Sequence, residues 1–254
     1  MFAPVSALHA VAILVGGLAA GTINAVVGSG TLITFPLLVG LGYPPLVANM
    51  SNSVGLVPGA VSGAVGFRRE LSGQRARIRR LGVASCLGGG TGAALLLTLP
   101  ASAFRAIVPV FIALALVLVL VQPRLGELIR RRHRSRLHSG ATVFAIVFVL
   151  GVYGGYFGAA QGILLVGALG LLLDDTLHRV NALKNVLATV VNGVAAIAFI
   201  ALGSLDWGVV VLLAVGSIVG GQLGSVVGRR LPEAALRGLI VLIGGFAIVK
   251  LWLG

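Results

Sequence analysis

Few residues in this chain could bind a charged solute, and they lie inside apolar runs. Lys184 is one of only two lysines and stands about one turn into the run that begins near residue 180. A cation held away from water would bind an anion and resist cations. The alternative is that its long side chain reaches back to the lipid headgroups at the end of the helix.

Polar side chains accompany Lys184 in two clusters. One comprises Asn49, Ser51, Asn52 and Ser53, and its counterpart comprises Asn181, Lys184, Asn185 and Asn192. Asn181 and Asn185 share a helix face, and Asn192 continues the same stripe. Asn24 stands alone in the first apolar run. Because an amide in hydrocarbon needs a partner, we expect these side chains to point inward, either along a polar path or as contacts between helices.

Two glycine-rich turns interrupt the apolar runs. The first reads Gly28-Ser29-Gly30-Thr31 and the second ends in Ala160-Gln161-Gly162. A helix that begins inside a membrane offers free N–H groups and the positive end of its dipole, and glycines let a ligand approach the backbone. We therefore expect both turns to face a small anion. The alternative is close helix packing, for which small residues are also used.

Acidic residues are absent from the apolar runs. All six lie in connections or at helix ends, namely Glu70, Glu127, Asp174, Asp175, Asp206 and Glu233. An acidic proton relay is therefore not expected. The sequence holds no GxxxxGK[ST] phosphate-binding loop, no metal-ligand spacing and no Ser–His–Asp set. We expect a protein that is not an enzyme and that has no cofactor and no metal.

The composition requires these residues to be positioned by membrane helices. Hydrophobic residues make up 58% of the 254 residues and charged residues only 10%, far from the balance of a soluble domain. A lipid-exposed backbone must satisfy its own hydrogen bonds, so the spans should be helices. We predict an all-α polytopic membrane protein, with one transporter domain over residues 1–254. Its apolar runs lie at about 8–27, 31–41, 45–67, 81–99, 104–121, 140–157, 162–173, 180–202, 207–228 and 235–253.

The net charge of +13 is concentrated in arginine-rich loops. These loops cover residues 68–80, 122–138 and 229–237. Short basic loops between apolar runs indicate the cytoplasmic side, where they would contact anionic membrane lipids. No aromatic platform accompanies them, so nucleic acid is not an expected partner. Lys250, the second lysine, is interpreted as an interfacial anchor.

The two halves of the chain resemble each other. Residues 21–28 and 151–158 begin and end with glycine 130 positions apart, and Asn52 has a counterpart in Asn185. With all basic loops in the cytoplasm, each half holds about five segments, and the halves start on opposite sides. We predict two inverted repeats, over about 8–121 and 140–253, joined by the cytoplasmic loop 122–139. The short or broken helices near 29–41 and 159–173 either cross fully or re-enter.

Longer stretches resemble the sulfite exporter TauE/SafE family, also called TSUP permeases. The first is GTINAVVGSGTLITFPLLVGLGYPPLVANMSNSVGLVPGAVSG. The others are GVYGGYFGAAQGILL, NALKNVLATVVNGVAAIAF and GSLDWGVVVLLAVGSIVGGQLGSVVGRRL. The resemblance covers nearly the whole chain and implies an inner-membrane permease for sulfite, sulfonates or other small organic anions. The family usually has a run of glycines in each turn, whereas this chain has Thr31 and Gln161 there. Their hydrogen-bonding groups would change the substrate preference.

The expected function is secondary transport of a small anion, namely sulfite, a sulfonate or a related organosulfur or carboxylate anion. The expected substrate-binding residues are Asn24, Ser29, Gly30, Thr31, Asn49, Ser51, Asn52, Ala160, Gln161, Gly162, Asn181, Lys184, Asn185 and Asn192. Export would be favoured by the interior-negative membrane potential, whereas uptake would need coupling to a proton or a sodium ion. The alternatives are a carrier of cations or neutral solutes and a non-transporting membrane assembly or sensory subunit.

Overall fold

The computed structural model describes residues 6–131, 140–227, 238 and 242, and within these residues it contains only helices and their connections. The first half comprises α1 (Ala7–Val26), α2 (Thr31–Gly40), α3 (Pro45–Gly66), the short 3-10 helix η1 (Arg68–Leu71), α4 (Arg75–Thr98) and α5 (Ala101–Arg131). The second half comprises α6 (Gly140–Tyr156), α7 (Gln161–Leu172), α8 (Leu177–Leu202) and α9 (Trp207–Val227). The predicted tenth segment, 235–253, lies outside the described residues apart from positions 238 and 242.

Local sequence signals set several helix starts. Ser6 caps α1 by accepting a hydrogen bond from the His9 N–H at 3.3 Å, and Thr176 caps α8 through the Arg179 N–H at 3.4 Å. The Asp206 carboxylate accepts from the Val209 N–H at 3.0 Å at the start of α9. Each side chain replaces a partner that the first turn of a helix lacks.

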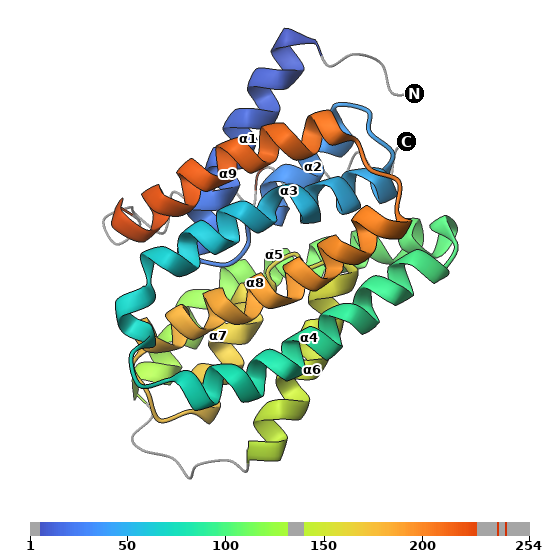
Figure 1. Ribbon diagram of the computed structural model, residues 1–254. Helices are drawn as coiled ribbons and strands as arrows, with labels where there is room; N and C mark the ends of the chain where they lie inside the picture. Colours follow the sequence, from blue (N-terminus) through green and yellow to red (C-terminus); the bar gives the residue numbers. More distant parts are fainter. Residues whose placement is uncertain (1–5, 132–139, 228–237, 239–241, 243–254) are drawn as a thin grey trace.

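Four long helices form a layer in which the two halves alternate. In Figure 1, α9, α3, α8 and α4 lie side by side in that order, and each packs against its neighbour. Helix α1 packs behind α9, while α6 packs behind α4. The first helix of each half therefore lies against the fourth helix of the other half. Two related halves would produce this exchange of partners, and their inversion across the membrane stays a prediction.

Five of the described helices are long and apolar enough to cross a membrane. These spans are Ala7–Val26, Arg75–Thr98, Ala101–Arg124, Leu177–Leu202 and Trp207–Val226. Helices α2, α6 and α7 are apolar but shorter, and α2 and α7 confirm the predicted short helices after the two glycine-rich turns. The polytopic all-α class is confirmed. Which of the predicted segments cross the membrane completely stays a prediction. Helix α3, which carries the Asn49–Asn52 cluster, is not among the five apolar spans.

Two predicted loops are largely helical. Residues 75–80 form the first turns of α4, and residues 122–131 continue α5 beyond the predicted end at 121. Helix α8 also starts earlier than predicted, at Leu177, so His178 and Arg179 are helical rather than loop residues. Arginine has a good helix propensity, so an apolar helix that emerges from lipid continues through a basic stretch. The basic loop 229–237 lies outside the described residues.

An aromatic cluster packs α5 against both short helices. Phe35 of α2 and Phe157 of the second glycine-rich turn make an edge-to-face contact with ring centroids 5.2 Å apart. Phe104 of α5 contacts both rings, at 6.4 and 6.2 Å. All three side chains are fully buried. The cluster packs α5 against α2 and the second glycine-rich turn.

Candidate functional site

The two glycine-rich turns cross in direct contact. The Gly162 N–H donates to the Gly28 carbonyl oxygen at 3.1 Å. Gly28 has a φ of +87°, which glycine adopts freely. A Cβ atom on either residue would overlap the Cα of the other. Only glycine allows this approach, so these two residues determine how closely the halves meet.

The protein itself satisfies N–H groups that were expected to face a substrate. The Asn24 side-chain oxygen accepts from the Gly30 N–H at 3.1 Å at the start of α2. Gly162, near the start of α7, gives its N–H to Gly28. The helix dipoles still favour negative charge nearby. These two N–H groups are therefore not available to a ligand, and side-chain donors would have to replace them.

The polar face of α8 holds the end of α1. The last four carbonyl groups of a helix lack partners within the helix. Lys184 Nζ donates to the Asn24 carbonyl at 3.0 Å, and the Nδ2 groups of Asn181 and Asn185 donate to the Ala25 carbonyl at 3.3 and 3.2 Å. A lysine there also complements the negative end of the α1 dipole.

Lys184 is buried, with only 1% of its surface exposed. Its Nζ is bonded at the crossing of the turns, so it does not reach back to the surface. The snorkelling alternative is therefore wrong for this conformation. Among the residues that the structure describes, no carboxylate forms an ion pair with it.

A small cavity of about 30 Å³ lies beside Lys184 at the crossing. Seven predicted site residues line it: Asn24, Thr31, Gln161, Gly162, Lys184, Asn185 and Asn192. The other lining residues were not among the expected substrate-binding residues, although Gly28 belongs to the first glycine-rich turn. They are Ala25, Gly28, Gly59, Ala60, Gly63, Gly158 and Ala188. Gly59 and Gly63 of α3 stand four apart, a spacing that places both on one helix face and could have indicated them.

Asn52 connects α3 to the first turn of α2. Its Oδ1 accepts a short hydrogen bond from the Thr34 hydroxyl, and its Nδ2 donates to the Thr31 hydroxyl at 3.3 Å. Thr31 lines the cavity. Asn52 therefore positions a lining residue without lining the cavity itself.

The other predicted residues lie around the cavity rather than on it. Gly30 and Asn181 serve in the hydrogen bonds described above, and Ala160 precedes α7 in a left-handed conformation with φ 57°. Asn49 donates to the Tyr156 carbonyl at 3.1 Å, and Ser51 accepts from the Asp206 N–H at 2.9 Å. Ser29 is buried, and its hydroxyl has no hydrogen-bond partner.

Gln161 is held against α6. Its Nε2 donates to the Leu150 carbonyl at 3.1 Å, and the side chain fills the space above Gly154, where a Cβ would overlap it. This contact fixes the first residue of α7. It also uses one of the amide donors expected to contact the substrate.

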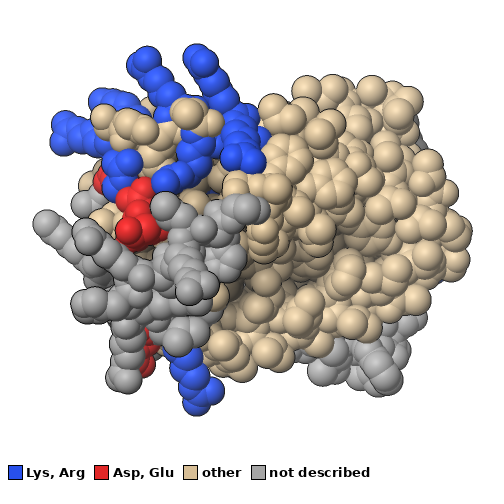
Figure 2. All heavy atoms as spheres, turned by 90° about the horizontal axis from the view of Figure 1, so that it is seen from below, with Lys and Arg blue, Asp and Glu red and all other residues tan. Residues whose placement is uncertain are grey.

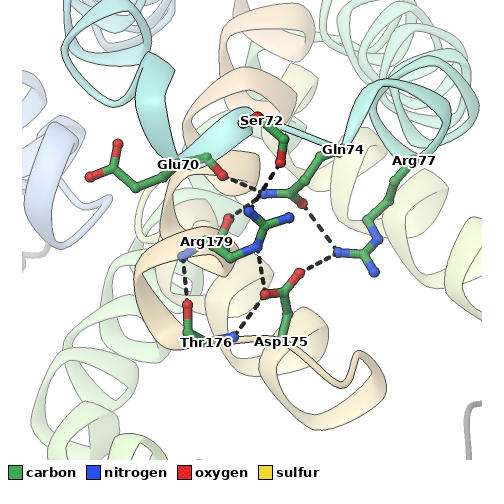
Figure 3. A network of polar contacts seen from close by, with 7 residues as sticks. All are labelled: Glu70, Ser72, Gln74, Arg77, Asp175, Thr176 and Arg179. Carbon is green, nitrogen blue, oxygen red and sulfur yellow. Dashed lines mark hydrogen bonds and ion pairs between the residues drawn. The ribbon is translucent and has the colours of Figure 1, made fainter.

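A second polar group, the Asp175 cluster, joins the two halves at the arginine-rich end (Figure 3). It consists of Glu70, Ser72, Gln74, Arg77, Asp175, Thr176 and Arg179. Asp175 accepts from Arg77 and Arg179, each at 2.8 Å. Gln74 donates to the Arg179 carbonyl at 3.2 Å, and Arg179 donates to the Ser72 carbonyl at 3.0 Å. The connection before α4 is thereby tied to the connection before α8.

The cluster predicts a pH-dependent contribution to stability. Burial alone would raise the pKa of Asp175, but hydrogen bonds from Arg77 and Thr176 and the charge of Arg179 outweigh it and lower the pKa. A lowered folded-state pKa stabilises the protein above the unfolded value of about 3.9, and this stabilisation is lost as the pH falls through the folded value. We expect Asp175→Asn to reduce the stability at pH 7 by about 1–2 kcal/mol.

Thermal unfolding of the purified protein in detergent, followed against pH, checks this expectation. The difference between wild type and Asp175→Asn should shrink below about pH 4. Asp174→Asn removes the same charge from the exposed neighbouring residue and should change little. If the two variants changed the stability equally, the contacts of Asp175 in the cluster would contribute no more than an exposed negative charge does.

The fold and this site define a class of protein: a polytopic helical membrane protein with a polar centre at the crossing of two broken helices. Residues 13–251 match the family described as sulfite exporter TauE/SafE. The chain therefore belongs to this family, a family of membrane transporters, and the sequence resemblance is confirmed. Membership is consistent with a permease rather than an enzyme.

Individual relatives agree with the family assignment. A "Probable membrane transporter protein" of Haemophilus influenzae is 28% identical over 235 residues, covering 92% of this chain and 91% of the relative. The Escherichia coli K12 "Probable membrane transporter protein YfcA" is 28% identical over 238 residues, covering 91% and 85%. A Sinorhizobium "Probable membrane transporter protein ORF9" is 26% identical over 247 residues, covering 96% and 93%. No solved structure matches the chain.

Proposed function

We propose that this transporter carries a small anion, namely sulfite, a sulfonate or a related carboxylate, past the crossing of its two glycine-rich turns. The buried Lys184 beside the cavity is the observation that supports this most directly. An uncompensated cation inside a membrane protein is costly, and a bound anion removes that cost. A carrier of cations would face repulsion at the same place.

Several donors around the cavity are available to a ligand. A lysine ammonium group has three N–H donors, and Lys184 uses one for the Asn24 carbonyl. Asn24 uses its oxygen for Gly30, which leaves its Nδ2 group as a donor. Asn192 also lines the cavity and carries a side-chain amide. Together these groups replace part of the hydration shell of an oxyanion.

Entry of the anion requires the helices to move. The cavity of about 30 Å³ is far below the roughly 300 Å³ at which small-molecule sites usually begin. We infer that groups of helices rock about the crossing, so that the site opens alternately to each side. Because the two halves interleave, each moving group contains helices of both halves. The Asp175 cluster would close the arginine-rich end and would have to separate when that end opens.

The proposed orientation places the arginine-rich end in the cytoplasm of a cell with an inner membrane. The Lys and Arg side chains that are visible in Figure 2 gather at one end of the molecule, which is the pattern expected of the cytoplasmic side. With the interior negative, each exported negative charge gains about 2.3 kcal/mol per 100 mV. We therefore expect export, and uptake would require coupling to a proton or a sodium ion.

Flux into liposomes tests the proposed function. The purified protein should carry labelled sulfite, sulfoacetate or acetate with saturable kinetics, and a positive potential on the receiving side should accelerate a net movement of negative charge. A pH-sensitive dye inside the liposomes distinguishes uncoupled flux from flux coupled to protons. Absence of flux and of binding for all three anions would contradict the proposal and favour a non-transporting assembly or sensory subunit.

A further inference from the structure

A second cavity opens at the arginine-rich end, away from the crossing. It has a volume of about 270 Å³ and lies between the start of α4, the start of α6 and the residue that follows α7. Leu81, Val143 and Leu173 provide apolar walls, and Arg77 and Arg80 belong to the same lining. We call this the α4–α6 groove. It combines an apolar interior with guanidinium groups at one end of the molecule.

The two arginines differ in the partners that their side chains bind. Arg77 is held by Asp175 at 2.8 Å and by Gln74 at 3.1 Å. Arg80 is exposed and lies over Gly140, where a Cβ would overlap its guanidinium group. Within the described ranges, no carboxylate forms an ion pair with Arg80. Arg80 is therefore the charge available to a ligand in the groove.

We propose that the α4–α6 groove binds an anionic phospholipid from the membrane. An acyl chain would cover Leu81, Val143 and Leu173, and the phosphate would bind Arg80. Basic pockets between transmembrane helices bind such headgroups, and arginine suits phosphate because its planar fork donates two parallel hydrogen bonds.

The chemistry of the groove discriminates between possible ligands. A free phosphate would leave the apolar walls uncovered, and a zwitterionic lipid would bring its own cation towards the arginines. A second copy of this chain could cover apolar walls, but its matching end would present further arginines, which repel Arg80. Charge complementarity and the apolar walls together favour an anionic lipid.

Native mass spectrometry of the purified full chain tests the proposal. The protein in detergent is given phosphatidylglycerol, phosphatidylcholine with the same acyl chains, or glycerol phosphate. We expect phosphatidylglycerol to be retained about fivefold more strongly than phosphatidylcholine, and glycerol phosphate not to be retained. Equal retention of the two lipids, or retention of glycerol phosphate alone, overturns the proposal.

Three variants localise the binding. Arg80→Gln should remove the roughly fivefold preference, whereas Arg79→Gln, which removes another exposed arginine that lies outside the groove, should keep it. Ala76→Trp should fill the groove from an exposed position and displace the lipid. If Arg79→Gln matched Arg80→Gln, the preference would reflect general charge and the groove assignment would be wrong. A dimer that dissociates in Ala76→Trp, with lipid retention unchanged, would identify a second chain as the occupant.

This test is independent of transport. Lipid retention is measured without flux, so a failure of the proposed anion transport leaves its result interpretable. Arg80→Gln alters an exposed side chain and keeps the proposal falsifiable even if Ala76→Trp fails to fold.

Discussion

Replacing Lys184 by methionine is expected to abolish anion flux. Methionine keeps most of the volume of the side chain and removes the charge and the donors beside the cavity. Removing one partner of a buried charge pair costs about 3–5 kcal/mol, which corresponds to roughly a hundredfold or more in binding. Flux of labelled sulfite, sulfoacetate and acetate into liposomes, with the amount of inserted protein measured, gives the result.

The remaining lysine offers a matched control. Lys250→Met removes the same group from the predicted interfacial anchor and should retain flux. Asn185→Ala should also lose flux, because Asn185 lines the cavity and holds the Ala25 carbonyl. Lys184→Met leaves the Asn24 carbonyl without its donor, at a cost of about 1–3 kcal/mol, so thermal unfolding must confirm that the variant is folded. Wild-type flux in a folded Lys184→Met protein would rule out Lys184 as the anion-binding group.

The second large effect is expected from the crossing glycines. A methyl group on Gly162 would overlap the Cα of Gly28, and a methyl group on Gly28 would also be forced into a left-handed conformation. Backbone strain costs about 1–3 kcal/mol, and overpacking adds about 1–3 kcal/mol. We expect Gly28→Ala to destabilise the protein more than Gly162→Ala, and both variants to lose flux.

Gly193→Ala is the control variant, because it shows what replacing glycine by alanine does where the added methyl group meets no neighbour. It lies in α8, as the cavity residues Lys184 and Asn192 do, but a Cβ there would meet no atom within 4 Å. Gly193→Ala should therefore retain flux and gain up to about 1 kcal/mol in stability. Thermal unfolding and flux are compared across the three variants. Normal flux in Gly162→Ala would contradict the assignment of the crossing as a fixed element of the site.

The helices were predictable because lipid imposes a simple rule on the sequence. An apolar run of sufficient length must become a helix, and a glycine-rich interruption must break it. The starts of α2 at Thr31 and of α7 at Gln161 therefore lie within two residues of the predicted starts near 29 and 159. The extension of α5 to Arg131 was missed, because the end of an apolar run marks where lipid ends and not where the helix ends.

The site was predictable only in outline. Polarity identified Lys184 and the amides, but it could not distinguish a side chain that lines the cavity from one that holds a neighbour. Ser51 and Asn49 illustrate this limit, since both are buried and bond to Asp206 and to Tyr156 respectively. The lining alanines and glycines carry no chemical signal of their own. They contribute because they leave space.

The Asp175 cluster shows a different limit. Asp175 and Arg77 are separated by 98 positions in the sequence, and nothing local indicates that they meet. The packing of α4 and η1 against α8 brings the two connections together. From the sequence alone, Asp175 could therefore only be interpreted as an acidic residue in a connection or at a helix end.

The hydrogen bond between Gly162 and Gly28 has a mechanical consequence. In the proposed rocking motion, the moving groups of helices would turn about this point of closest approach, which would act as a fulcrum. The ends of the molecule can then travel far while the middle hardly shifts. A solute held at the fulcrum would keep the same ligands whichever mouth is open, so release would be decided by which side water enters.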